Sequence, residues 1–99
     1  AAGALSAVHN ITGTYQITDT DYYMGVNSAA PVTLNLPDAA SVGSAKTYII
    51  KDETGQAGTN NITIVPVAGQ LIDGQANNVL AIGYESISIV CDGTKWSII

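Results

Sequence analysis

Hydrophobic and polar residues alternate over short stretches along most of the chain, and this period of two predicts β-strands. Apolar and small polar side chains alternate over residues 86–91, and Asp92-Gly93 separates this stretch from residues 95–99. An Asp-Gly pair between two such stretches predicts a β-hairpin, because a type I′ turn needs positive φ at both central residues. Residues 78–99 therefore predict three short strands joined by tight turns.

Similar stretches recur about every eight to twelve residues from Ile11 onward, a spacing typical of sandwiches and barrels. Further strands are predicted over residues 12–18, 21–26, 32–36, 46–52 and 61–67, with a short edge at 71–74. One helical turn is predicted between Pro37 and Gly43, with Asp38 favouring its N-terminus. The fold prediction is an all-β, small antiparallel sandwich or jelly-roll-like domain of eight or nine short strands. No sequence period supports a solenoid, although β-helix-like rungs stay open.

Composition agrees with this fold class. Twelve Ile, eight Val and ten Thr make up nearly a third of the 99 residues, and these residue types favour strands. A chain of this length forms one small domain. Residues 1–10 are small and carry no acidic or basic side chain apart from His9, so they are predicted to be a connector or stalk remnant. Residues 11–99 are predicted to form a single β domain.

The charge balance excludes several classes of partner. Three lysines face eight carboxylates, for a formal net charge of −5. A nucleic-acid binder needs a basic surface, and three scattered lysines do not supply one. No apolar stretch approaches the roughly 20 residues of a membrane helix, so membrane insertion is not expected. The single cysteine, Cys91, excludes an internal disulfide framework and is interpreted as a small buried apolar residue.

Few residues offer catalytic or metal-binding chemistry. His9 is the only histidine, so neither a Cys/His metal set nor a nucleophile with a positioned histidine base is expected. Glycoside hydrolysis needs two carboxylates, and the chain offers three candidate pairs: Asp19 with Asp21, Asp52 with Glu53, and Asp73 with Asp92. Each has an ordinary interpretation as a turn or strand-end residue that bonds the local backbone. The chain is therefore predicted not to be an enzyme and to hold no cofactor or metal.

Glycan binding has the best chemical basis among the binding functions. Sugars are held by aromatic faces together with short polar side chains, and Tyr23 is predicted to share an outward face with Asp21. Tyr84 lies in a predicted turn. Asp21, Tyr23 and Tyr84 are therefore the candidate glycan-binding residues, whereas Trp96 pairs with Ile98 on one strand face and is predicted to lie in the core. Asp19 and Asp21 alone offer too few oxygen ligands for a calcium loop.

A family resemblance appears in residues 32–64. The string VTLNLPDAASVGSAKTYIIKDETGQAGTNNITI, followed by IDG and a terminal DGTKWSII, resembles the terminal modules of bacteriophage tail fibres and tailspikes. In such modules a similar order of turn residues leads to an NNITI strand and a closing DG-x-x-W hairpin. The resemblance covers about two-thirds of the chain. It implies an extracellular virion structural protein, a homotrimer joined to an upstream fibre domain, and a role in host-surface contact or in fibre capping.

Apolar residues on both faces of single strands give separate support for a trimer. The pairs are Ile49 with Ile50, Ile64 with Val65, and Ile89 with Val90. A small domain has a single hydrophobic core, which buries only one face of each strand. The second apolar face therefore predicts burial against other subunits. The predicted function is attachment of a fibre to a host-surface polysaccharide. The alternatives are a trimerisation or capping module with no ligand, and part of a depolymerase with two carboxylates beside a cleft.

Overall fold

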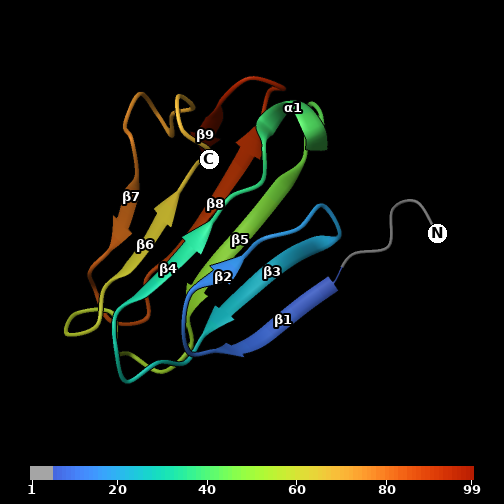
Figure 1. Ribbon diagram of the computed structural model, residues 1–99. Helices are drawn as coiled ribbons and strands as arrows, with labels where there is room; N and C mark the ends of the chain where they lie inside the picture. The colour runs from blue at the N-terminus through green and yellow to red at the C-terminus, as the bar shows by residue number, and fades with distance from the viewer. Residues whose placement is uncertain (1–5) are drawn as a thin grey trace.

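The computed structural model describes residues 6–99, which contain nine β-strands and one helical turn (Figure 1). The strands are β1 (Ser6–Ile11), β2 (Tyr15–Gln16), β3 (Asp21–Val26), β4 (Val32–Asn35), β5 (Thr47–Asp52), β6 (Ile62–Val65), β7 (Asn78–Leu80), β8 (Ser86–Cys91) and β9 (Trp96–Ile98). The helix, α1, spans Ala39–Val42. The predicted all-β class is confirmed.

The strands form two sheets that face each other. The five-stranded sheet has the order β1-β3-β5-β8-β9, and the four-stranded sheet has the order β2-β4-β6-β7. Buried side chains of both sheets form one core between them. Its largest fully buried members include Trp96, Tyr48, Met24, Leu34 and Ile64. Trp96 is therefore a core residue, as the alternation in the last strand predicts.

The expected antiparallel pairing is wrong for the first two-thirds of the chain. Four of the seven strand pairs are parallel and three are antiparallel. The pairs β1–β2, β3–β4 and β5–β6 each give one strand to each sheet, and successive pairs stack like rungs of a β-helix. The turn at Asp19-Thr20 connects the two sheets instead of closing a hairpin, because β2 and β3 lie in different sheets.

The end of this stack is closed by the later strands. β8 pairs with β5 and β7 pairs with β6, both in antiparallel orientation. The register places apolar residues of successive rungs side by side: Val8 lies beside Met24, and Met24 lies beside Ile50. Such stacking of apolar side chains gives neighbouring rungs a common core, which stabilises them through burial of apolar surface.

The predicted boundary between connector and domain is corrected by β1. Ser6–Ile11 pairs with β3 as the edge strand of the five-stranded sheet, so residues 6–10 belong to the domain. The alternation there is hard to see because the register shifts between Val8 and Ile11, and Asn10 has a φ of 59°. Asparagine tolerates this left-handed conformation better than most residues. Residues 1–5 of the predicted connector lie outside the described residues.

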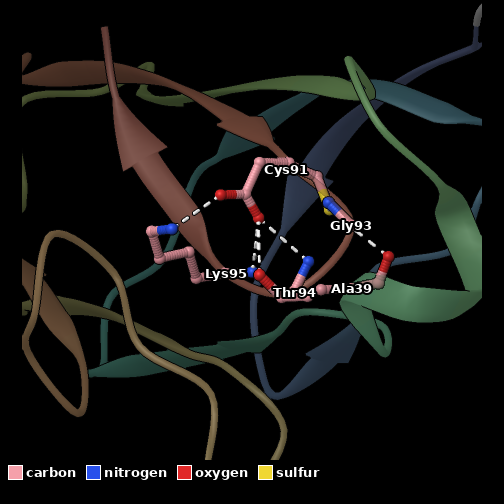
Figure 2. A network of polar contacts seen from close by, with 6 residues as sticks. Ala39, Cys91, Gly93, Thr94 and Lys95 are labelled. Atoms are coloured by element: carbon pink, nitrogen blue, oxygen red, sulfur yellow. Dashed lines mark hydrogen bonds and ion pairs between the residues drawn. The ribbon is translucent and has the colours of Figure 1, made fainter.

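Two local predictions are confirmed in the described chain. α1 is a single turn in which the Asp38 side chain accepts a hydrogen bond from the Ala40 N–H, and Gly43 ends it with a φ of 82°. β8 and β9 form the expected hairpin (Figure 2). Its turn is not type I′, because only Gly93, with a φ of 96°, has positive φ there. The Asp92 side chain closes the turn, because its Oδ1 accepts the N–H groups of Thr94 and Lys95, each at 2.9 Å.

Candidate functional site

Polar and aromatic side chains gather on the outer face of the five-stranded sheet, at the end where β5 finishes. We call this surface the tyrosine strip; it consists of His9, Tyr23, Lys51, Glu53 and Tyr84. The strip crosses β1, β3 and β5 and reaches the turn before β8. Its members come from four separate parts of the sequence, and the parallel register of β1, β3 and β5 brings three of those parts side by side.

Glu53 is the centre of one half of the strip. Its Oε2 accepts a hydrogen bond from the Tyr23 hydroxyl at 2.8 Å and lies 3.0 Å from Nδ1 of His9. The rings of His9 and Tyr23 are 5.4 Å apart. The Glu53 side chain lies directly over Gly25, where a Cβ would overlap the carboxylate. The absence of a side chain at position 25 therefore allows Glu53 to reach Tyr23.

These contacts fix the ionisation of Tyr23. Burial is the largest cause that raises the pKa of Tyr23 to about 12, and the hydrogen bond and negative charge of Glu53 add to it. The phenol therefore stays protonated at neutral pH and donates to the carboxylate. The second oxygen of Glu53, Oε1, has no hydrogen-bond partner among the contacts of the described residues, so this half of the strip presents a free acceptor.

Tyr84 forms the other half and is the most exposed aromatic residue of the described chain, with 61% of its surface exposed. Its backbone has a φ of 66°, unusual for a residue with a large side chain. The ring lies against Gly55, where a Cβ would come within 2.6 Å of Cε2. Lys51 donates from Nζ to the Tyr84 carbonyl, and its Nζ lies 5.6 Å from the ring centroid. The ring is thus exposed but held in place.

Asp52 holds the Tyr84 backbone from inside the domain. It is 1% exposed, and its Oδ2 accepts the N–H groups of Ala57 and Tyr84, each at 2.9 Å. Its Oδ1 accepts the N–H groups of Thr54 and Gly55, each at 3.1 Å. Burial by itself would raise the pKa of Asp52, but the backbone N–H groups outweigh it and lower that pKa. The carboxylate therefore joins the loop after β5 to the turn before β8.

Glu85 completes the support of this turn. Its Oε1 accepts the N–H groups of Ala81 and Ile82, at 3.0 and 3.2 Å. The Glu85 N–H donates to the Ile82 carbonyl at 3.0 Å. Together with Asp52, these bonds satisfy the N–H groups of residues 81, 82, 84 and 85. A turn fixed in this way loses little conformational freedom when something binds to it.

The structure separates the three predicted glycan-binding residues. Tyr23 and Tyr84 both lie in the tyrosine strip, although in different halves. Asp21 is 4% exposed and lies at the beginning of β3, two residues before Tyr23. Its Oδ2 accepts hydrogen bonds from the Tyr15 hydroxyl at 2.8 Å and the Thr18 N–H at 2.9 Å. Because internal donors occupy Asp21, it is not available on the outer surface of the sheet.

The sequence alone does not single out His9, Lys51 or Glu53 as site residues. His9 falls in the predicted connector, and Glu53 has an ordinary interpretation as a strand-end residue beside Asp52. One signal is present: Gly25 interrupts an otherwise apolar and aromatic strand. Glycine inside a strand often marks a place where another group approaches closely. Here that group is Glu53, but the sequence does not say which residue fills the space.

Most of the carboxylates that hydrolysis would need make structural contacts in the described chain. Asp52 faces the interior, whereas Glu53 faces outward to Tyr23. Asp73 accepts the Ile98 N–H at 3.1 Å, and Asp92 accepts the Thr94 and Lys95 N–H groups in its own turn. Within residues 6–99, no group of three or more His, Cys, Asp or Glu residues is placed to hold a metal ion. The absence of enzymatic activity stays a prediction.

The comparisons with known proteins add no assignment. The sequence matches no protein-family model, and a search of curated proteins finds no significant match. None of the helical structure over residues 6–99 is long and apolar enough to cross a membrane. Function is therefore inferred from the geometry of the tyrosine strip and from the sequence resemblance.

Proposed function

We propose that the chain is a trimeric, sandwich-like module of a phage tail fibre or tailspike that attaches the virion to a host-surface glycan through the tyrosine strip. The observation that carries the proposal is Tyr84: a ring with 61% of its surface exposed, on a turn whose backbone is held by Asp52, Lys51 and Glu85. Folding normally buries large aromatic rings, so a fixed and exposed ring is typical of a contact surface.

The chemistry of the strip suits a sugar. The C–H face of a pyranose packs on an aromatic ring, and its hydroxyl groups bond to carboxylates and ammonium groups. Tyr84 supplies the ring, Glu53 supplies an acceptor and Lys51 supplies donors. The ring also needs no rearrangement before binding, which is consistent with this role. The resemblance of residues 32–64 to tail-fibre modules favours a receptor on a cell surface.

A glycan screen tests this function. The wild-type chain and the variants Tyr84→Asn and Ile82→Asn are applied to a panel of bacterial surface oligosaccharides. Asn suits the positive φ of position 84 and removes the ring, while Ile82→Asn removes an exposed apolar residue of the same turn. We expect Tyr84→Asn to lose binding by about tenfold or more, equivalent to about 1.4 kcal/mol. Ile82→Asn should bind as the wild type does. Equal binding by all three proteins would contradict the proposal.

A second candidate function, trimerisation or capping without a ligand, is favoured by a different surface. Ile49 and Val90 lie half-buried on the outer face of the five-stranded sheet, where the alternation predicts a second apolar face. Ile99 is 71% exposed and its N–H bonds the Ser88 carbonyl, which extends this apolar surface past β8. Contact between copies would remove these side chains from water.

Solution mass tests the assembly function. Light scattering over a dilution series should give a mass near three chains, and Ile49→Thr should shift it towards one chain. Ile99→Thr should have a weaker effect in the same direction, because Ile99 follows the edge strand β9, whereas Ile49 lies on the central strand β5. A monomer at every concentration would contradict the trimer. A trimer that binds no glycan would favour assembly as the main role.

A further inference from the structure

We infer that the ligand of the tyrosine strip is an uncharged glycan segment, and that anionic polysaccharides are excluded from it. The inference rests on the proposed function and specifies the substrate class of the same site. It comes from the charges around Tyr84, because a surface that holds a sugar ring also acts on every charge that the sugar carries.

Carboxylates outnumber cations around the strip. Glu53 belongs to the strip, and Asp52 accepts the Tyr84 N–H. Glu85 accepts the N–H groups of Ala81 and Ile82 in the same turn as Tyr84, whereas Lys51 is the one lysine among the strip residues. Lys46 lies over the ring of Tyr48 and Lys95 pairs with Asp92, so neither belongs to the strip. His9 faces Glu53 and Tyr23 and, if protonated, would offset one of the carboxylates.

The ammonium group of Lys51 already makes contacts within the protein. Lys51 donates to the Tyr84 carbonyl and lies beside the ring, so it supports the turn on which the ring is carried. No carboxylate pairs with it among the salt bridges of the described residues. An anionic sugar would gain this one cation but would meet the outward-facing carboxylate of Glu53, with Glu85 in the Tyr84 turn and Asp52 buried beneath it, within a chain of net charge −5. Charges of one sign concentrated at a surface repel a ligand of that sign.

A neutral sugar meets complementary groups at the same place. Its C–H face packs on Tyr84 without a charge penalty. Its hydroxyl protons find the Oε1 of Glu53, which the Tyr23 and His9 contacts leave free because both use Oε2. Hydrogen bonds to an ionised acceptor are stronger than those between neutral groups. The strip is therefore an acceptor-rich aromatic surface, suited to hydroxyl-rich ligands.

The test uses pairs of oligosaccharides of equal length, one built of neutral hexoses and one bearing a carboxylate on each repeat. Binding to the full chain is measured by saturation-transfer NMR and calorimetry at about 10 mM and about 150 mM salt, where the Debye length falls from about 30 to about 8 Å. We expect the neutral member to bind at least about tenfold more tightly at low salt. Its affinity should change less than about twofold with salt.

Two variants sharpen the result. Glu53→Gln removes a negative charge but keeps an acceptor, so the acidic oligosaccharide should gain affinity while the neutral one loses a few-fold. Lys51→Met removes the one cation of the strip and a support of the Tyr84 turn, so both ligands should lose affinity and the acidic one should lose more, which widens the preference for the neutral ligand. Preference for the acidic ligand, lost at high salt and in Lys51→Met, would overturn the inference but keep glycan binding. Binding of neither ligand would overturn both the inference and the proposed function.

Discussion

The two ends of the five-stranded sheet use the same residue type in different ways. At one end Asp52 finishes β5, and at the other Asp92 follows β8. Asp52 is 1% exposed and accepts N–H groups from as far away as Tyr84, 32 residues along the chain. Asp92 is exposed and bonds only to Thr94 and Lys95 in its own turn (Figure 2). One aspartate organises tertiary structure, and the other organises a hairpin.

The contribution of a carboxylate to stability therefore depends on whether the N–H groups it bonds would be buried without an acceptor once it is removed. Water can replace the contacts of an exposed turn residue, so such contacts contribute little to stability. Buried N–H groups that lose their acceptor cannot form hydrogen bonds to water instead, and each costs about 1–3 kcal/mol of stability. The Asp52 end should therefore be sensitive to small changes, and the Asp92 end should tolerate them. Substitutions at the two ends test this contrast, and the largest effect is expected at Asp52.

Asp52→Asn should destabilise the domain most. The amide would keep one oxygen acceptor but would direct its NH₂ group at N–H donors, because both carboxylate oxygens accept two bonds each. We expect a loss of about 3 kcal/mol in the free energy of unfolding, measured by urea titration followed by Trp96 fluorescence. A loss below about 1 kcal/mol would mean that the loops find other acceptors and that the two ends of the sheet are alike.

Acidification should reproduce part of this effect in the wild-type chain. The pKa of Asp52 is lowered in the folded state from its ordinary value of 3.8. The stability it contributes is therefore fully present above that ordinary value and is lost as the pH falls through the lowered folded pKa. The pKa values of Asp38 and Asp92 are lowered as well, but both groups are exposed and should contribute less.

The measurement is urea unfolding at pH 7, 4, 3 and 2 for the wild type and Asp52→Asn. We expect the wild type to lose more stability below about pH 4 than the variant, because the variant has no carboxylate at position 52 to protonate. Parallel curves for the two proteins would show that Asp52 is not the group responsible for the acid sensitivity.

Gly55→Ala should have the next largest effect and should also displace Tyr84. Gly55 has a φ of 79°, and a Cβ there would collide with the Tyr84 ring. Gly69→Ala is the matched control, because Gly69 has a φ of 89° but no atom within 4 Å of the added Cβ. We expect a loss of about 1 kcal/mol for the control from backbone strain alone and about 2 kcal/mol for Gly55→Ala.

Binding separates the two glycine variants further. Gly55→Ala should weaken glycan binding by the tyrosine strip, since the ring must move, whereas Gly69→Ala should bind as the wild type does. Equal stability and equal binding for the two variants would show that Tyr84 does not depend on close contact with Gly55. In that case the exposed ring would be free to move, and the strip would not be preorganised for binding.

The same contrast explains what the sequence can predict. The Asp92 hairpin and the Asp38-capped turn α1 are local, and each is readable within a few residues of sequence. The turn at Gly93 differs from the predicted type I′ because Asp92 lacks positive φ and closes the turn through its side chain. The all-β class and the buried Trp96 and Cys91 follow from composition and alternation.

Strand pairing and the tyrosine strip cannot be predicted from local sequence, because both depend on residues far apart in the chain. Alternation shows which side of a strand is buried but not which strand lies beside it, so it does not predict the parallel rungs. Asp52 looks like any strand-end aspartate until the turn at Tyr84 folds against it. Residue type and predicted position are enough to select Tyr23 and Tyr84, while Glu53 and His9 join the strip only through the register of β1, β3 and β5.

Asp92→Asn gives the smallest expected effect and completes the comparison. The variant keeps a side-chain oxygen for the Thr94 and Lys95 N–H groups, which are its near neighbours in sequence, and loses only the ion pair with Lys95 at 2.8 Å. Because that pair is exposed and screened by salt, the loss should stay below about 1 kcal/mol. Urea unfolding at low and high salt measures it: the difference from wild type should shrink at high salt. A loss as large as that of Asp52→Asn would show that the Asp92 turn, packed beside Cys91 and α1, is as important to the fold as the buried end.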